Sequence, residues 1–370
     1  MDTQLPTIDL SIIVPTFNER KNVPMLVRCL HDALAGLRWE VIFVDDDSPD
    51  GTANVIRAIA QQDPHVRCIQ RIGRRGLSSA CIEGMLASSA PYLAVMDADM
   101  QHDERLLPQM LTTLKNDEAD IVVGSRYVAG GGIGDWSRSR LQISQFATRL
   151  SKFVVKAELS DPMSGFFMLK REAFNGAMRD LSAIGFKILV DLFASSPKPL
   201  RFKELPYEFR TRQAGESKLD SQAAWDYVML LLDKSVGRYV PVRFLSFALV
   251  GGVGVVVHLV TVAALFRLIA VGFVSSQTIA TVVEMVSNFS LNNLITYRDM
   301  RLRGWGWARG LLSFVVACSV GALANVGVAS YLFAERADWI VAALSGVLVG
   351  AVWNYAVTAV YTWNKPKKAA

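Results

Sequence analysis

Four long apolar segments fill the last third of the chain and constrain its fold more than any other feature. They cover residues 244–266, 272–297, 310–334 and 339–363 of a 370-residue sequence. Each is close to the roughly 20 residues that a helix needs to cross a bilayer. We therefore expect residues 241–370 to form an all-α domain of four transmembrane helices.

Basic residues concentrate at three of the positions that flank these segments, and the other two links carry little net positive charge. Because cytoplasmic loops are enriched in Lys and Arg, this asymmetry predicts a multi-pass membrane protein whose preceding domain and C-terminus are cytoplasmic. The first residues lack the basic and apolar regions of a signal peptide. Together with the short loops, this favours a prokaryotic plasma membrane. The basic residues are Arg238, Arg243, Arg298, Arg301, Arg303, Arg309, Lys365, Lys367 and Lys368.

Polar residues interrupt the second apolar segment. Glu284, Asn288 and Asn292 recur every four residues, so a helix places them on one side. Polar groups are costly in hydrocarbon and normally face other helices or a cavity. We expect interhelical hydrogen bonds, with Asn325 and Asn354 of the later segments as candidate partners, and a path for a lipid headgroup as the alternative.

Short apolar strands alternate with helix-like segments in the first 240 residues. Strands are expected near residues 10, 39, 66, 92 and 119. This alternation predicts an α/β domain over residues 1–215 with a mostly parallel sheet and flanking helices. Residues 216–240 would form juxtamembrane helices at the bilayer surface. In such sheets ligands collect at the carboxyl ends of the strands.

Oxygen-bearing side chains follow the apolar strand that begins at Tyr92. In an extended chain Asp97, Asp99 and Gln101 would project from the same face. Such groups suit a hard divalent cation, Mg²⁺ or Mn²⁺. A bare Asp-X-Asp is more often a solvated turn or a helix cap. A second acidic loop, 45–47, follows another strand and favours the cation.

Composition argues against several other classes of protein. A net charge of +5 without a long basic stripe favours a membrane surface or an anionic ligand over nucleic acid. The four cysteines have no paired spacing, so neither a zinc site nor a disulfide framework is indicated. The four histidines show no constellation for catalysis either.

Five motifs occur in an order that resembles family 2 glycosyltransferases and, within them, the polyprenol (dolichol) phosphate mannosyltransferases. Segments 247–254 and 288–293 resemble a GtrA-like four-helix membrane domain. The resemblance implies a GT-A fold and an inverting transfer of one sugar from a nucleotide donor to a lipid phosphate. The motifs are Val14-Pro-Thr-Phe-Asn-Glu19, Val44-Asp-Asp-Asp-Ser-Pro-Asp-Gly-Thr52, Asp97-Ala-Asp-Met-Gln101, Gly124-Ser-Arg-Tyr127 and Asp161-Pro-Met-Ser-Gly-Phe166.

The resemblance also implies roles for individual residues. The metal ligands would be Asp97, Asp99 and Gln101. Arg126, Arg140 and Ser144 would hold the acceptor phosphate and, with Asp97 and Asp99, form the catalytic set. Without the resemblance, Arg212 and Lys218 would count as surface residues; with it, they approach the diphosphate. The nucleotide-sugar site would comprise Pro15, Phe17, Glu19, Val44, Asp46, Asp97, Arg212 and Lys218.

The expected acceptor makes a general base unnecessary. A phosphate monoester has a second pKa near 6 and is largely dianionic at neutral pH, so positioning and charge compensation by arginines suffice. We expect GDP-mannose as donor and polyprenyl (dolichyl) phosphate as acceptor.

Three other activities compete with this one. The first keeps the acceptor but uses UDP-glucose, UDP-galactose or a UDP-amino sugar. A processive polysaccharide synthase would be expected to carry a Gln-X-X-Arg-Trp element, which the sequence lacks. The third is a lipid-linked sugar flippase or scaffold whose first domain only binds.

Overall fold

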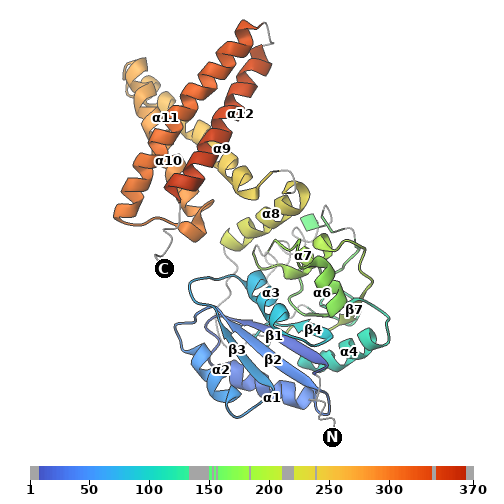
Figure 1. Ribbon diagram of the computed structural model, residues 1–370. Helices are drawn as coiled ribbons and strands as arrows, with labels where there is room; N and C mark the ends of the chain where they lie inside the picture. Colours follow the sequence, from blue (N-terminus) through green and yellow to red (C-terminus); the bar gives the residue numbers. More distant parts are fainter. Residues whose placement is uncertain are drawn as a thin grey trace. The chain divides into compact units, whose positions relative to one another are not determined.

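The computed structural model describes residues 8–132, 150–151, 154–155, 157–182, 185–210, 221–237, 240–335 and 339–363. The chain forms two compact units, Met1–Val236 and Gly237–Ala370 (Figure 1). The division therefore falls inside the stretch that the sequence assigns to juxtamembrane helices.

The first unit is built on a seven-stranded sheet with the order β3-β2-β1-β4-β6-β5-β7. Among the described strands, only β6 runs antiparallel to its neighbours, β4 and β5. The predicted α/β fold with a mostly parallel sheet is confirmed. The strands are β1 Leu10–Thr16, β2 Trp39–Asp45, β3 Val66–Gln70, β4 Tyr92–Val95, β5 Ile121–Ser125, β6 Phe167–Lys170 and β7 Phe202–Pro206.

Helices cover both faces of this sheet because successive strand residues point in opposite directions. Ile12 and Val14 belong to the same buried cluster as residues of α1, α2 and α4. Ile13 and Val44 belong to a second cluster, with residues of α3, α6, α7 and α8. The helices are α1 Val23–Ala33, α2 Thr52–Ala60, α3 Leu77–Ala87, α4 Leu107–Lys115, α6 Arg171–Ala177, α7 Ile188–Ser195 and α8 Ser221–Val236.

A buried ion pair joins α8 to the sheet domain. Lys234 Nζ lies 2.7 Å from an oxygen of Asp191, which is fully buried in α7. Lys234 also donates to Ser195 Oγ. The same Asp191 accepts hydrogen bonds from Ser182. The end of α8 is thus fixed to the first unit by charge as well as by apolar packing.

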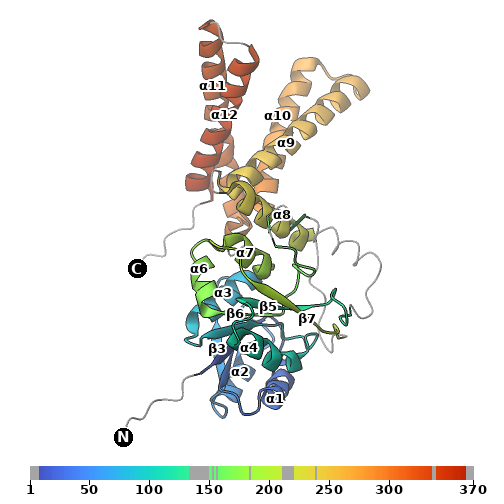
Figure 2. The same cartoon turned by 90° about the vertical axis from the view of Figure 1, so that its right-hand side faces the viewer.

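The second unit contains the four predicted helices, arranged as two hairpins (Figure 2). Two stretches, Val242–Leu268 and Trp305–Leu332, are long and apolar enough to cross a membrane by length and composition. The helices are α9 Val242–Ala263, extended by a π-helical turn Ala264–Leu268, α10 Phe273–Leu294, α11 Trp305–Ala334, and α12 Trp339–Val357, extended by a π-helical turn Thr358–Thr362.

The two hairpins repeat the same contacts. In the first, the hydroxyls of Ser246 and Thr296 lie 2.9 Å apart; in the second, those of Ser313 and Thr362 do. A glycine of the first helix faces an asparagine of the second in both cases. A Cβ added at Gly254 would meet Asn288, and one added at Gly321 would meet Asn354.

The two repeats meet at an aromatic cluster. The rings of Tyr297 and Trp363, which end the two hairpins, stack with centroids 4.1 Å apart. Phe289 and Phe314 pack beside them. Asn293 fixes the adjoining link, because its carboxamide exchanges two hydrogen bonds with the backbone of Leu302.

Polar side chains of α10 pair both with α9 and with the end of the second hairpin, where Trp363 Nε1 donates to Asn293 Oδ1 at 3.1 Å. Glu284 lies 2.9 Å from His258 Nδ1, and His258 Nε2 lies 2.8 Å from Gln277 Oε1. Interhelical pairing is therefore confirmed for Glu284, but its partner is His258 and not Asn325 or Asn354. Asn288 instead packs against Gly254 of α9, and its Oδ1 has no hydrogen-bond partner among the described residues. The physical reason is hairpin geometry, which places consecutive helices side by side.

Candidate active site

Polar residues gather at one edge of the sheet in the first unit. The parallel strands β1, β2, β4 and β5 end there, and the antiparallel β6 begins there. The loop at 161–165, which precedes β6, is thereby brought to the same edge. The turn after β2 is tied to the end of β1, since Asp46 N donates to Thr16 O at 3.0 Å.

The acidic turn after β2 contains one structural and one site-facing carboxylate. Asp45 is fully buried, and both of its oxygens accept hydrogen bonds from Ser48. Asp46 accepts a 2.7 Å hydrogen bond from Gly76 N. Burial raises the pKa of the Asp46 carboxyl. The assignment of Asp46 to the nucleotide pocket stays a prediction. The position of its carboxylate at the end of β2 is compatible with that assignment.

The loop after β3 brings arginines that the sequence reasoning missed. Arg71 is only 1% exposed, and its Nε lies 3.3 Å from Asp46 Oδ1. It also donates to Gly76 O and Ser79 Oγ, so it holds the loop in place. The guanidinium of Arg75 lies over the ring of Phe17 at 4.3 Å. The sequence feature that could have indicated these arginines is the basic run Arg71-Ile-Gly-Arg-Arg-Gly76.

The other nucleotide-pocket candidates lie at the ends of β1 and β2. Pro15 is half-buried in β1. The Val44 side chain is fully buried in the core, so a ligand could meet only its backbone. Glu19 accepts a 2.7 Å hydrogen bond from Asn22 Nδ2, and its N–H donates to Thr52 Oγ1.

The acidic loop after β4 is not extended. The sequence-based prediction that Asp97, Asp99 and Gln101 share one face required an extended chain. The strand ends at Val95, and Met100 has a positive φ of 66°. Strict alternation from Asp97 to Gln101 is therefore wrong. The Asp97 side chain is 37% exposed, whereas Asp99 is 5% exposed. The turn is instead closed by Gln101 N, which donates to Asp99 Oδ1 at 3.1 Å.

The donor set of this loop fits a hard divalent cation. Two carboxylates and one carboxamide lie within five residues, and all three offer oxygen ligands. Gln101 uses its Nε2 to donate to Arg210 O, so the amide nitrogen is committed to the protein. Arg210 in turn pairs with Asp103 and Glu104 and so fixes the loop from the other side.

His102 lies beneath this loop as a neutral support. Its Nδ1 accepts a hydrogen bond from Asp97 N at 3.1 Å, which places its proton on Nε2. Nε2 lies 3.8 Å from Asp97 Oδ2. Burial lowers the pKa of His102 to about 4, and the ring stacks on Phe166. A buried neutral imidazole positions Asp97 but cannot serve as a base at neutral pH without leaving this arrangement.

Arg126, after β5, is held by a buried bidentate ion pair. Its Nε and Nη2 each lie 2.7 Å from an oxygen of Asp161, which is fully buried. Burial alone would lower the pKa of Arg126, but the hydrogen bonds and charge of Asp161 raise it overall. Any acceptor phosphate bound by Arg126 would share the guanidinium with Asp161. Asp161 is a further site residue whose pairing the sequence did not predict.

The remaining predicted residues, Arg140, Ser144, Arg212 and Lys218, lie outside the described residues. The structure therefore brings together Asp46, Asp97, Asp99, Gln101 and Arg126 at one edge. Their placement at strand ends agrees with the expected location of the site.

Two family models match the chain. Residues 11–176 match the model for Glycosyl transferase family 2, and residues 246–363 match that for the GtrA/DPMS transmembrane domain. A dolichol-phosphate mannosyltransferase of Pyrococcus furiosus is 34% identical over 96% of this chain and 99% of its own. The chain belongs to this family.

Two further dolichol-phosphate mannosyltransferases, from Saccharomyces cerevisiae and Mycosarcoma maydis, match about two thirds of the chain, 63% and 66%. The enzyme of Saccharomyces cerevisiae is 37% identical over 63% of this chain and 89% of its own. Among solved structures, a Mycobacterium tuberculosis glucosyl-3-phosphoglycerate synthase with Mn²⁺, UDP and phosphoglyceric acid covers 61% of this chain and 78% of its own, with 16% identity and a TM-score of 0.46. That likeness is too distant to transfer a ligand.

Membership in the family makes this chain a glycosyltransferase that associates with membranes. The fused membrane domain predicted from the sequence is thus confirmed as GtrA-like. The match to the glycosyltransferase family 2 model lies within the first unit.

Proposed function

We propose that this glycosyltransferase transfers mannose from GDP-mannose to a polyprenyl (dolichyl) phosphate, with inversion at the anomeric carbon. The observation that carries the proposal is the full-length relationship to a dolichol-phosphate mannosyltransferase, which includes both units. The acidic and basic groups at the carboxyl edge of the sheet are those that such a reaction needs.

Donor binding would use the ends of β1 and β2. Asp46 is held by Gly76 N and by Arg71, so its position is fixed before a nucleotide arrives. Phe17, with Arg75 over its ring, offers a flat apolar surface at the same edge. Arg212 and Lys218 are proposed to add positive charge near the diphosphate.

Asp97, Asp99 and Gln101 would hold Mg²⁺ or Mn²⁺. When bound, the ion would neutralise charge that develops on the departing nucleotide diphosphate. Asp97 is oriented by His102 through its backbone N–H, and Gln101 by the backbone of Arg210. The chain's own contacts therefore fix the backbone at Asp97 and the side chain of Gln101.

The transfer itself needs no base from the protein. An oxygen of the dianionic acceptor phosphate attacks C1 of the sugar as the bond from C1 to the diphosphate oxygen breaks, and GDP leaves. Arg126, Arg140 and Ser144 are proposed to hold the acceptor phosphate, as arginine does in bidentate fashion. Asp161 would keep the Arg126 guanidinium in one orientation.

The bilayer supplies the acceptor. We propose that the catalytic unit and the C-terminus face the cytoplasm, where nucleotide sugars are found, in a prokaryotic plasma membrane. Attachment to a membrane domain confines the enzyme and its lipid substrate to one surface and raises their effective concentration.

A donor panel tests the reaction. Membranes that contain the protein are incubated with polyprenyl phosphate and radiolabelled GDP-mannose, UDP-glucose, UDP-galactose or a UDP-amino sugar. We expect label in the lipid fraction with GDP-mannose alone, and a loss of more than 100-fold on addition of EDTA. Label transferred only from a UDP-sugar would overturn the donor assignment. Transfer from no donor at all would revive a role in binding or transport.

A further inference from the structure

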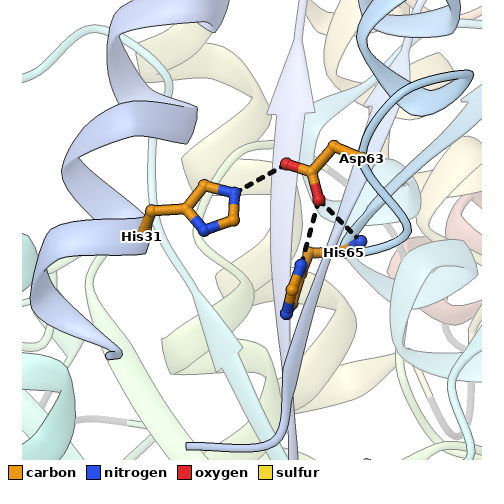
Figure 3. Close-up of side chains that lie close together, drawn as sticks. All are labelled: His31, Asp63 and His65. Carbon is orange, nitrogen blue, oxygen red and sulfur yellow. Dashed lines mark hydrogen bonds and ion pairs between the residues drawn. The ribbon is translucent and has the colours of Figure 1, made fainter. Parts of the chain in front are cut away.

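A second group of possible metal ligands lies in the first unit, away from the proposed catalytic loop, which is the loop of Asp97, Asp99 and Gln101 after β4. His31 belongs to the last turn of α1, Asp63 to the turn between α2 and β3, and His65 directly precedes β3. Figure 3 shows both imidazoles directed at the one carboxylate between them. The sequence separates His31 from His65 widely, which is why no constellation was apparent there.

The distances place these ligand atoms in one small volume. His31 Nε2 lies 2.6 Å from Asp63 Oδ2, and His65 Nδ1 lies 3.0 Å from Asp63 Oδ1. One ligand atom from each residue falls within 4.8 Å of the others. Zn²⁺ holds such ligands at roughly 2.0–2.2 Å, which puts neighbouring ligand atoms about 3.3–3.5 Å apart. Small side-chain rotations would therefore complete a site.

The surroundings hold the three side chains in place. His65 stacks on the ring of Trp39 at 4.6 Å, and His31 meets that ring edge-on at 5.0 Å. The Asp63 carboxylate also accepts a 2.9 Å hydrogen bond from His65 N. The side chains of His31 and His65 are 43% and 36% exposed, so an ion can reach them from solvent.

The chemistry of the group distinguishes it from the catalytic loop. Two imidazole nitrogens with one carboxylate suit borderline ions such as Zn²⁺, whereas Mg²⁺ prefers oxygen alone. The group also lies where β2 and β3 begin, at Trp39 and Val66, and so at the opposite edge of the sheet from the catalytic loop.

We propose that His31, Asp63 and His65 bind a divalent transition-metal ion of the Zn²⁺ class, which links α1 to the edge strand β3. Three protein ligands leave one position of a tetrahedral ion to water. The ion joins the end of a helix to the outermost strand, so its role is to stabilise this edge. It takes no part in sugar transfer.

Metal binding by the full-length protein in detergent tests the proposal. The protein is stripped with EDTA and titrated with Zn²⁺ in excess Mg²⁺, which occupies oxygen-ligand sites. We expect one Zn²⁺ per chain and a higher thermal midpoint with Zn²⁺. In His31→Ala and in Asp63→Asn the dissociation constant should rise at least tenfold and the thermal gain disappear. The exposed Gln62→Ala, in the same turn, is the matched control and should bind as the unaltered protein does.

A spectroscopic measurement identifies the ligands directly. Cu²⁺ bound in place of Zn²⁺ should show paramagnetic coupling to two imidazole nitrogens, and to one in His31→Ala. If His65→Ala unfolds because it loses the Trp39 contact, the exposed His31 position still decides the question. Unchanged Zn²⁺ affinity in both His31→Ala and Asp63→Asn would overturn the proposal. Binding only at millimolar Zn²⁺, or Cu²⁺ without imidazole coupling, would do the same.

Discussion

At the scale of single residues, the candidate site contains carboxylates that already accept hydrogen bonds from other residues of the chain. Asp99 is nearly buried, accepts the N–H of Gln101 and is the proposed metal ligand least accessible to solvent among those described. We expect Asp99→Asn, which keeps the shape but removes the charge, to lower transfer by at least 100-fold. Asp32→Asn, an exposed position on α1, provides the control.

The measurement is label transferred to polyprenyl phosphate per amount of correctly inserted protein. Unchanged transfer by Asp99→Asn that still responds to EDTA would remove Asp99 from the metal site.

The pair formed by Arg126 and Asp161 gives a prediction about stability. Asp161→Asn would leave a buried guanidinium without its counter-charge, and breaking such a pair typically costs about 3–5 kcal/mol. The thermal midpoint of the full-length protein should fall clearly. By contrast, Asp117→Asn removes an exposed partner of Arg201 and should change the midpoint little. Equal midpoints for the two variants would show that the buried pair contributes nothing to stability.

His102 makes stability depend on pH. Its pKa is lowered to about 4 in the folded protein by burial, against an ordinary value of 6.5. The folded state therefore binds fewer protons between these values, so stability from this group is present above about pH 6.5 and is lost as pH falls toward 4. The thermal midpoint measured from pH 7.5 to 4.5 should decline less steeply in His102→Gln. A decline of the same slope would assign the effect to other groups.

How much of the site was predictable depended on whether its residues were neighbours in the sequence. Asp97, Asp99 and Gln101 could be chosen as candidates because they follow an apolar strand directly. The directions of these three side chains were not predicted correctly, because the positive φ of Met100 ends the alternation that a strand would impose. The partnership of Arg126 with Asp161, like the burial of Arg71, arises from distant segments that only the folded sheet brings together.

At the scale of elements, the alternation of strands and helices was sufficient to predict a mostly parallel sheet. It did not reveal that β6 runs antiparallel. Residues 167–170 are a short apolar run whose direction depends on where the preceding loop returns to the sheet. Because β6 runs antiparallel, the loop that precedes it and contains Asp161 lies at the edge of the sheet where β4 and β5 end.

Hairpin contacts in the membrane unit provide a test at this scale. A Cβ at Gly254 would lie 2.3 Å from Asn288 Oδ1, so the asparagine or the helix must move. We expect Gly254→Ala to destabilise the protein by about 1–3 kcal/mol, as overpacking does. Gly252→Ala, in the same helix with nothing within 4 Å of its added Cβ, should be neutral or slightly stabilising.

The thermal midpoint in one detergent reports both changes. A Gly252→Ala variant that loses as much stability as Gly254→Ala would show that glycine itself matters at these positions, and not the contact with Asn288.

At the scale of the whole molecule, the distribution of charge predicts the orientation of the chain. The link after α10 carries Arg298, Arg301 and Arg303, while the link after α9 carries few charges. Arg301→Cys should therefore react with a membrane-impermeant maleimide from the cytoplasmic side, and Gly272→Cys from the other side. Inverted and right-side-out vesicles, with the unaltered protein as background, make the comparison. The reverse pattern would contradict the proposed topology.

The repeated hairpins have a practical consequence for such measurements. Ser246 with Thr296 and Ser313 with Thr362 are the same hydroxyl pair occurring twice within one polypeptide. A substitution made in one copy can be compared with its twin under identical detergent, temperature and expression. Any difference between the two variants then reports how the two hairpins differ in their contribution to stability or to transfer.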